Sequence, residues 1–426
     1  MAIHNQLNTD LSNEFFKPVF DVYPDSSQPY KCAGISDINF CQLGTLRCLS
    51  SAKTGHEFLQ KHADHEVADI TADHFFKALK SKRRLKNLTS VNSLLAGHLS
   101  TKTHDPLSQF PELAKWEVNL IDGHYHKAAC FDPKHEDSKG EFKSVATGHF
   151  FRMDLRNQHL SCLDFVEPGK GKKKSHDVRV IRKSLPEVLR NNVPKGVKMM
   201  LVWDKACIDY RLWFDLKHTY GIYFITMEKA NSAVTVSSGN LVDRSDPRNE
   251  GVDSDHLVDS STGVQLRRIV YTNPRDGKTY TYLSNDFTLP AGVLVLLYKH
   301  RWDEEKVFYE LKSKMEERKS WASSKEAKQA HAVFLCLAHN LLLLLEEHVI
   351  QDEGLSDQYE RKKDLGRKRV GSPESLRQNK VGNMVNTAIV RATHRTQRFI
   401  RWVRNRIYMQ TPWSQSLNRL SILWGG

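Results

Sequence analysis

Three observations predict an α/β fold for this chain of 426 residues, with helical regions at both ends. WEVNLID alternates like a half-buried strand and ends in an acid, and two further strand patterns follow it, VATGHFFRMDL and HLSCLDFVE. VKMMLVWD is a nearly continuous apolar run, which is typical of a buried parallel strand. Amphipathic helical patterns lie between the later strands, as expected where parallel strands are joined by helices.

The remaining elements follow in a defined order. One amphipathic helix, DVRVIRKSLPEVLRNN, is expected after the third strand, and another, IDYRLWFDLKHTYG, after the fourth. IYFITME predicts a second buried strand. After a polar, β-leaning insertion, a helix is expected to start near Pro290 and to run past Lys312. This order of three strands, helix, strand, helix, strand, insertion and helix is that of a ribonuclease-H-like α/β core.

The net charge of +13 favours an anionic partner, with nucleic acid first and an acidic membrane surface second. Residues 361–426 carry 15 basic and 2 acidic residues, an excess equal to that of the whole chain. Two more basic runs, PGKGKKKSHDVRVIRKS and KSKRRLK, strengthen the nucleic-acid interpretation, although such runs are often only solvated faces. Trp402, Trp413 and Trp424 lie within the C-terminal basic stretch and are expected to pack rather than to stack on bases.

The cysteine and apolar patterns indicate a protein of the reducing cytoplasm. The seven cysteines include no CxxC pair. The longest nearly apolar run, AVFLCLAHNLLLLL, is shorter than the roughly 18 residues that a spanning helix needs, so a buried core helix is expected and no membrane partner.

The predicted domains are a helical, DNA-binding region over 1–110, a ribonuclease-H-like core over 111–228 and 289–350, a β-rich insertion over 229–288, and a basic, helical C-terminal region over 351–426 that contacts DNA or dimerises.

Two acids at strand ends, Asp122 and Asp204, are the first candidates for chemistry. Central strands of one sheet bring such carboxylates side by side, and their repulsion is costly unless a divalent cation lies between them. A third carboxylate from a helix completes an oxygen-rich site for two Mg²⁺ ions roughly 3.5–4 Å apart, and Mn²⁺ can replace Mg²⁺ there. Taken alone, an aspartate at a strand end is more often a helix cap or turn residue.

A polar helix face supplies the third acid. Tyr298, Arg301, Glu305 and Lys312 lie at offsets of 0, 3, 7 and 14 residues, within about 60° of one face at roughly 100° per residue. The carboxylate of Glu305 suits a metal ion, whereas the phenol, guanidinium and ammonium groups suit phosphate oxygens.

Other polar residues have less specific interpretations. His124 and His126 form an HxH pattern that lacks the partners of a zinc site, so supporting or solvent-exposed roles are expected. Asp209 is interpreted as a helix cap rather than as a replacement for Asp204. Lys205 either contacts DNA or is simply exposed.

The spacing Tyr-x2-Arg-x3-Glu-x6-Lys resembles the signature helix of the insertion-sequence DDE transposases that carry a Tyr-Arg-Glu-Lys motif. LIDGHYH and LVWDKACID resemble the contexts of that family's two catalytic aspartates, and the likeness extends over about residues 115–345. The resemblance implies a cut-and-paste DNA transposase. Its metal-binding triad would be Asp122, Asp204 and Glu305, and Tyr298, Arg301 and Lys312 would hold the element end near the scissile phosphate.

The resemblance also implies partners and a location. Family members bind terminal inverted repeats as a homodimer on two paired ends and join the 3′-hydroxyls to target DNA, in the bacterial cytoplasm and at the nucleoid when DNA-bound. Their hairpin route can use a tryptophan of the insertion to stack on a flipped base. No tryptophan occurs here between Trp213 and Trp302, which leaves Tyr271, Tyr280 and Tyr282 as stacking candidates.

Two alternative functions remain open at this point. One is a ribonuclease-H-like nuclease or resolvase that cuts DNA without joining it. The other is a repurposed, non-catalytic DNA-binding protein, which the three intact acids disfavour because a binding module has no need for mutually repelling carboxylates.

Overall fold

The computed structural model describes residues 10–23, 35–64, 70–136, 140–144, 146–166, 189–190, 193–205, 208–274, 276–311, 315, 320–359, 362 and 397–425. For residues 135, 143–144, 166 and 302–305 it describes the backbone only. The structural findings below concern these residues.

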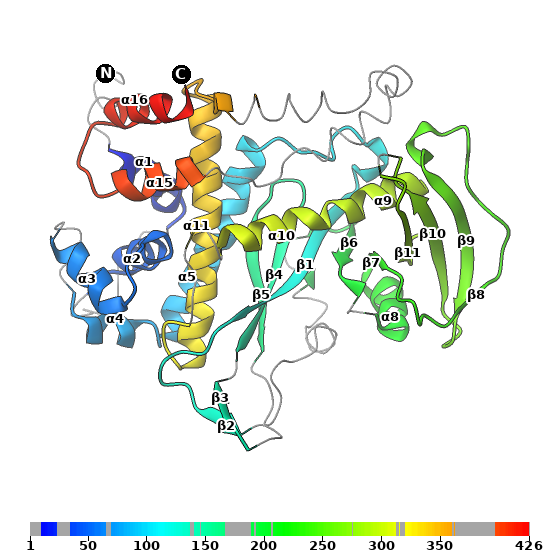
Figure 1. Cartoon of the computed structure of the whole chain (residues 1–426), viewed down its shortest axis with the longest axis horizontal. Helices are drawn as coiled ribbons and strands as arrows, with labels where there is room; N and C mark the ends of the chain where they lie inside the picture. The colour runs from blue at the N-terminus through cyan, green and yellow to red at the C-terminus, as the bar shows by residue number, and fades with distance from the viewer. Residues whose placement is uncertain are drawn as a thin grey trace.

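The N-terminal part of the described chain is helical. Its helices are α1 (Leu11–Val22), α2 (Asp37–Leu49), α3 (Gly55–Asp64), α4 (Ala72–Ala78) and α5 (Lys82–Lys102). Four of them begin with a side-chain cap, from Asp10, Ser36, Thr71 and Ser81. Helices α1, α2 and α5 pack against the long helix α11 (Lys325–Gln351), which runs vertically in Figure 1. The predicted helical character of this region is confirmed.

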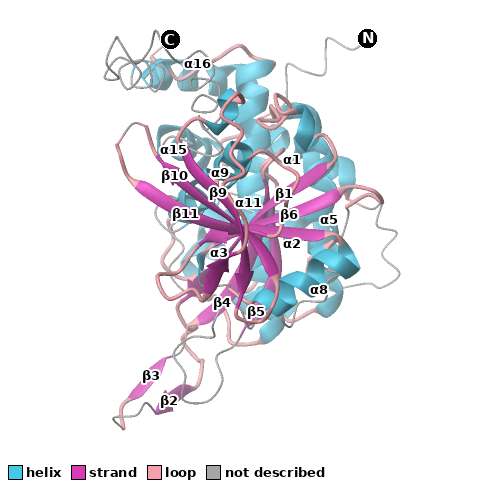
Figure 2. Cartoon of the chain, turned by 90° about the vertical axis from the view of Figure 1, so that its right-hand side faces the viewer, coloured by secondary structure: helices cyan, strands magenta, loops and turns pink. Residues whose placement is uncertain are grey.

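Nine strands of the described chain form one twisted sheet, which Figure 2 shows nearly edge-on, with the strands one behind another. They are β1 (Trp116–His126), β4 (Thr147–Asp154), β5 (Leu160–Val166), β6 (Lys198–Trp203), β7 (Ile222–Met227), β8 (Val234–Val236), β9 (Val252–Ser260), β10 (Gln265–Thr272) and β11 (Thr279–Ser284). Their order across the sheet is β5-β4-β1-β6-β7-β11-β10-β9-β8. β4 pairs antiparallel with β1 and β5, whereas β6 pairs parallel with β1 and β7. The chain therefore has a mixed α/β fold.

Strands β8–β11 continue this sheet instead of forming a separate one. β11 pairs antiparallel with β7, and β10, β9 and β8 follow outward. A buried ion pair holds this part: Arg267 donates to both carboxylate oxygens of Asp255, at 2.8 and 2.6 Å. The same guanidinium donates to the carbonyl of Leu289 at 2.6 Å, which ties β10 to the residue two before α9 (Ala291–Lys299). A separate hairpin is formed by β2 (Lys134–Glu136) and β3 (Phe142–Ser144).

The helix between β6 and β7 begins and ends as its sequence predicts. In α8 (Tyr210–Tyr220), the Asp209 carboxylate accepts from the amide of Leu212 at 3.2 Å, which confirms that Asp209 is a cap. Gly221 ends the helix with φ of 63°, a left-handed conformation that favours glycine. The helix predicted over DVRVIRKSLPEVLRNN lies mostly outside the described residues.

The helix predicted to run unbroken from Pro290 past Lys312 is interrupted. α9 ends at Lys299, and α10 (Arg301–Tyr309) follows after a turn at His300. Glu310 and Leu311 then form a wider π turn. His300 itself keeps right-handed helical dihedrals, with φ of −65° and ψ of −12°, and Lys312 lies outside the described residues.

The run Ala332–Leu345 is buried within α11, which confirms it as a core helix. Of the described helices, only α11 is long and apolar enough to cross a bilayer, and here it is enclosed by other helices and the sheet. The C-terminal helices α15 (Gln397–Arg406) and α16 (Trp413–Trp424) bury all three tryptophans of the basic stretch, as expected.

The basic run KSKRRLK partly serves the fold. Arg83 and Arg84, at the start of α5, both pair with the buried carboxylate of Asp37, with Arg84 Nε at 3.3 Å. Arg84 also donates to the carbonyl of Ile35 at 2.8 Å. Two cations of this run thus join α5 to α2, while Lys82 and Lys86 stay exposed.

A buried polar network joins α5, β5 and α11. His159 donates through Nε2 to the carbonyl of Asn92 at 2.6 Å. The Asn340 amide donates to Asn92 Oδ1 and to the carbonyl of Leu160, both at 2.9 Å, and accepts from the amide of Leu160. Burial lowers the pKa of His159 from 6.5 to about 4, so the folded protein holds this imidazole neutral.

This network predicts a loss of stability in mild acid. As the pH falls below 6.5, the unfolded chain protonates His159 before the folded chain does, so the free energy of unfolding decreases until the pH reaches about 4. At pH 5 the loss relative to pH 7 is expected to be about 2 kcal/mol. Urea unfolding at both pH values measures it. The His159→Gln variant should lose this component, and an unchanged pH dependence in the variant would contradict the assignment.

Candidate active site at the sheet

The pairing of β1 with β6 brings two acids together. The two strands are parallel, and their last paired residues are Ile121 and Trp203. Asp122 and Asp204 are the next residues on each strand, and both are partly exposed. Since paired strands lie roughly 4.8 Å apart, the two carboxylates start from neighbouring backbone positions.

The alternation of side chains decides which face the acids share. Ile121 and Trp203 belong to the core under α8, so the residues before and after them point to the opposite face. Leu120 and Val202, on that opposite face, belong to the main core together with residues of α9 and α10. Asp122 and Asp204 are therefore directed to the face that α9 and α10 cover.

One sequence prediction about Asp122 was wrong. β1 does not end at this acid but continues to His126, and Asp122 is paired with Phe151 of β4 inside the strand. Asp122 Oδ1 also accepts from the amide of Gly123 at 2.7 Å. Asp122 is thus fixed by strand pairing with β4, one residue beyond the last pair of β1 with β6, whereas Asp204 follows the end of its strand.

Tyr298 lies within electrostatic range of both Arg301 and Asp204. The Tyr298 side chain is only 3% exposed, and the Arg301 guanidinium lies 5.7 Å from the centre of its ring. Burial raises the pKa of Tyr298, the Arg301 guanidinium lowers it, and the Asp204 carboxylate raises it. The Tyr282 ring lies 5.0 Å away on the other side. The Tyr298 ring is therefore buried between Arg301 and Tyr282, and the Arg301 guanidinium packs on it.

Glu305 is placed by its backbone alone. It lies on α10, four residues after Arg301, and α10 contacts β1. The structure does not describe its side chain, nor any part of Lys312, so the predicted roles of both remain predictions. Of the six residues selected from the sequence, Asp122, Asp204, Tyr298 and Arg301 are described with their side chains, at the junction of β1, β6, α9 and α10.

The HxH histidines are buried, so a solvent-exposed role is wrong. His124, two residues after Asp122 on the same side of β1, stacks on Phe308 of α10 with ring centres 5.4 Å apart and planes 9° apart. His126 contacts the rings of His149 and His331, at 4.3 and 5.0 Å. No group of three or more possible ligands within the described residues is arranged to hold a metal ion.

The stacking between His124 and Phe308 was not foreseen from the sequence. The signal was present, since His124 shares the face of Asp122 by strand alternation and Phe308 lies one turn after Glu305 on α10. Recognising the pair required knowing that α10 crosses β1, which Figure 1 shows.

Two of the three tyrosines proposed for base stacking are enclosed. Tyr271 is 6% exposed and Tyr282 is 3% exposed. The hydroxyl of Tyr271 accepts from Lys299 at 2.7 Å, and the same ammonium lies 4.3 Å from the ring centre. Only Tyr280 is partly accessible, so Tyr271 and Tyr282 act as supports beneath α9.

Comparison with known proteins assigns this region to a family. Residues 150–341 match the family described as transposase DDE domain, a segment that contains Asp204 and the Tyr298–Lys312 stretch but begins after Asp122. Protein y4zB of Sinorhizobium fredii, whose name describes it as a transposase, is 26% identical over 147 residues. That alignment covers 33% of this chain and 41% of the relative, so the chain spans about two fifths of the relative's length.

Two solved structures show only distant likeness. The Drosophila P element transposase strand transfer complex gives a TM-score of 0.25 at 12% identity, over 96% of this chain and 87% of that chain. The structure of the Aquifex aeolicus Argonaute gives a TM-score of 0.20 at 12% identity, over 42% of this chain and 24% of that chain. Both scores are too low to support a structural argument. The likeness to the transposase DDE domain thus covers residues 150–341, and a relative that aligns with a third of the chain is named a transposase.

Proposed function

We propose that this chain catalyses metal-dependent cut-and-paste transposition, in which it cleaves phosphodiesters at the ends of an insertion sequence and joins the 3′-hydroxyls to target DNA. The observation that carries the proposal is the parallel register of β1 and β6. It sets Asp122 beside Asp204 on the face covered by the helices that bear Arg301 and Glu305.

The strand order supports a ribonuclease-H-like core. The first three strands of the main sheet, β1, β4 and β5, pair antiparallel, and β6 and β7 then add in parallel on the other side of β1. Strands β8–β11 fall between the second acid and Glu305, where the β-rich insertion is expected. The domain limits given above remain part of the proposal.

The acids suit a divalent cation by their chemistry. Two partly exposed carboxylates at neighbouring positions repel each other, and oxygen ligands are those that Mg²⁺ and Mn²⁺ prefer. Asp122, Asp204 and Glu305 would hold the ions. When bound, such ions activate the attacking hydroxyl or water and stabilise the departing oxygen of the phosphodiester.

The surrounding residues orient the reacting phosphate. Arg301 is held over the ring of Tyr298, which also lies within electrostatic range of Asp204, so its guanidinium is positioned for a phosphate oxygen at the acids. Lys312 would add a second cation. The buried Tyr298 acts through Arg301 in this arrangement, instead of gripping DNA directly.

The proposed partners are DNA and a second copy of this chain. Terminal inverted repeats and target DNA are the expected nucleic acids, bound by a homodimer in a paired-end complex. The net charge of +13 supports the DNA part of this proposal, and a cytoplasmic, nucleoid-associated location in bacteria is proposed with it.

The first test uses the acids. Asp204→Asn and Glu305→Gln are each expected to lower cleavage of element ends by at least about a hundredfold while end binding survives. Cleavage and strand transfer are measured with labelled ends, Mg²⁺ and a target plasmid. Normal cleavage by either variant would refute the site, whereas cleavage without joined products would favour the nuclease alternative.

The second test compares two cations of α10. Arg301→Ala should reduce cleavage or end-complex formation by about tenfold or more, because it removes a preorganised guanidinium beside the acids. Lys306→Ala, on an exposed position of the same helix, serves as the matched control. Equal effects of the two substitutions would contradict the helix-face assignment.

The third test concerns the ring that braces α10. His124→Ala removes the stacking on Phe308 and should both lower cleavage and raise the Mg²⁺ concentration needed for half-maximal cleavage, because Glu305 is carried by α10. His124→Phe retains a ring, so its half-maximal Mg²⁺ concentration should return to that of the wild type. If His124→Ala lowered only thermal stability, with no change in the Mg²⁺ dependence, the positioning role would be wrong.

A further inference from the structure

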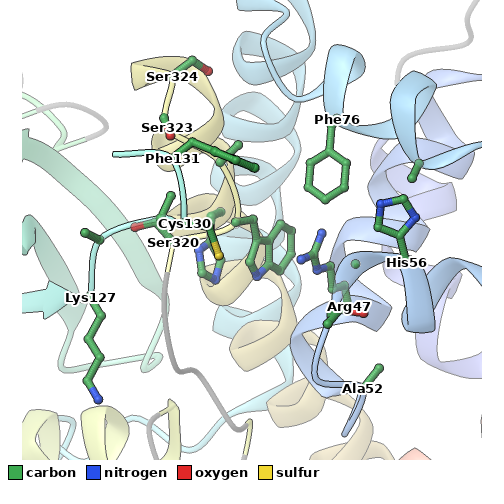
Figure 3. Close-up of a pocket in the computed structure, with 18 of the residues that line it drawn as sticks. Arg47, Ala52, His56, Phe76, Lys127, Cys130, Phe131, Ser320, Ser323 and Ser324 are labelled. Carbon is green, nitrogen blue, oxygen red and sulfur yellow. The ribbon is translucent and has the colours of Figure 1, made fainter. Parts of the chain in front are cut away.

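A large cavity lies apart from the acids, between the N-terminal helices and the loop after β1. Its volume is about 1360 Å³. Figure 3 shows Lys127, Cys130 and Phe131 on one side of it and Phe76, His56 and Arg47 on the other. Neither the catalytic proposal nor the sequence patterns account for this cavity.

Arg47 presents a cation that has no carboxylate partner among the described residues. Its guanidinium carbon lies 4.3 Å from the ring centre of Trp321 and 5.3 Å from that of Phe76. Its Nη1 is buried and has no hydrogen-bond partner within the described part of the chain, where no acid lies within ion-pair distance either. Burial lowers the pKa of Arg47 to about 10. An anionic group in the cavity would relieve this cost.

The backbone at Gly55 permits this arrangement. A Cβ at this position would lie 2.6 Å from the Phe76 ring and 3.0 Å from Arg47 Nη1. The first residue of α3 therefore leaves the space in which the guanidinium and the ring meet.

Phe131 presents an aromatic ring on a rigid turn. The ring is 92% exposed, and Figure 3 shows it extending toward the side of the cavity where Phe76 lies. The turn is closed by Asp132, whose amide donates to the carbonyl of Ala129 at 3.1 Å and whose Oδ2 accepts from the Ala129 amide at 2.7 Å. Asp132 Oδ1 also pairs with Lys328 of α11 at 3.0 Å, with both side chains buried. A buried ion pair thus fixes the turn that exposes Phe131.

The rim of the cavity is basic. Lys53, Lys80 and Lys127 line it with exposed side chains, and His56 is exposed beside them. Asp73 is the one acid among the described lining residues, and it pairs with Lys77 at 2.6 Å. The combination of an exposed ring, a guanidinium with no ion pair among the described residues and surface lysines matches a ligand with a flat aromatic group and a phosphate. It argues against an apolar peptide.

We infer that this cavity receives an unpaired nucleotide of the bound DNA, with its base against Phe131 and its phosphate at Arg47. The inference rests on the proposed function, which supplies the DNA. Lys127 follows Asp122 by five residues, about 17 Å along an extended strand at 3.3 Å per residue. That distance equals about five base steps of duplex, so DNA held at the acids reaches the cavity.

The experiment uses the full chain with Ca²⁺ in place of Mg²⁺ and two fluorescent DNA probes, a blunt duplex and the same duplex with a short single-stranded tail carrying 2-aminopurine. The wild type should bind the tailed probe more tightly and change the 2-aminopurine signal as the base stacks. Phe131→Ala should weaken tail binding by about fivefold or more and leave blunt-duplex binding unchanged. Arg47→Met should also weaken tail binding, and its binding should depend less on salt.

Phe142→Ala is the matched control, because Phe142 is 67% exposed on β3 and lies outside the cavity lining. Equal tail binding by wild type and Phe131→Ala, or an equal loss by Phe142→Ala, would overturn the inference while DNA binding and transposition stand. If the wild type bound neither probe, the proposed function itself would fail, and the inference with it. Binding of free nucleotide in preference to tailed DNA would also overturn the assignment to a DNA strand.

Discussion

The parallel register of β1 and β6 is the constraint on which the proposed active site depends. It is locked from both faces of the sheet, since Leu120 and Val202 belong to one core and Ile121 and Trp203 to the other. Burying four such side chains contributes about 6–12 kcal/mol. Two carboxylates about 5 Å apart repel by about 3 kcal/mol at an effective dielectric constant of 20. Apolar burial therefore outweighs the repulsion and keeps the acids adjacent.

The elements and the acid pair were predictable because their signals are local. Alternation, apolar runs and capping residues predicted β1, β6, β7 and α8, and the polar spacing predicted helical structure at Tyr298, Arg301 and Glu305, whose functional role stays a prediction. The break at His300 was not predictable, because nothing in VLLYKHRWDE is a helix breaker and the interruption depends on tertiary packing. Strand alternation also gave no warning that β1 continues past Asp122.

Burial was the property that the sequence conveyed least. His124, His126 and Tyr298 are polar residues whose enclosure depends on which helix crosses which strand. Arg83 and Arg84 appeared as part of a basic surface run, yet they serve Asp37 within the fold. Conversely, nothing in the sequence near Phe131 predicted that its ring is exposed. The exposure depends on a turn that Lys328 fixes through Asp132, and Lys328 lies nearly two hundred residues away in the sequence.

The union of β8–β11 with the main sheet has a mechanical consequence. Because β11 shares hydrogen bonds with β7, and Arg267 ties β10 to the segment before α9, strands β8–β11 are continuous with the main sheet. A force applied to the outer strands, such as that of DNA being bent across them, would pass as shear along one ladder to the strands beside the acids. In this respect the nine strands act as one stiff unit that is held together by backbone hydrogen bonds.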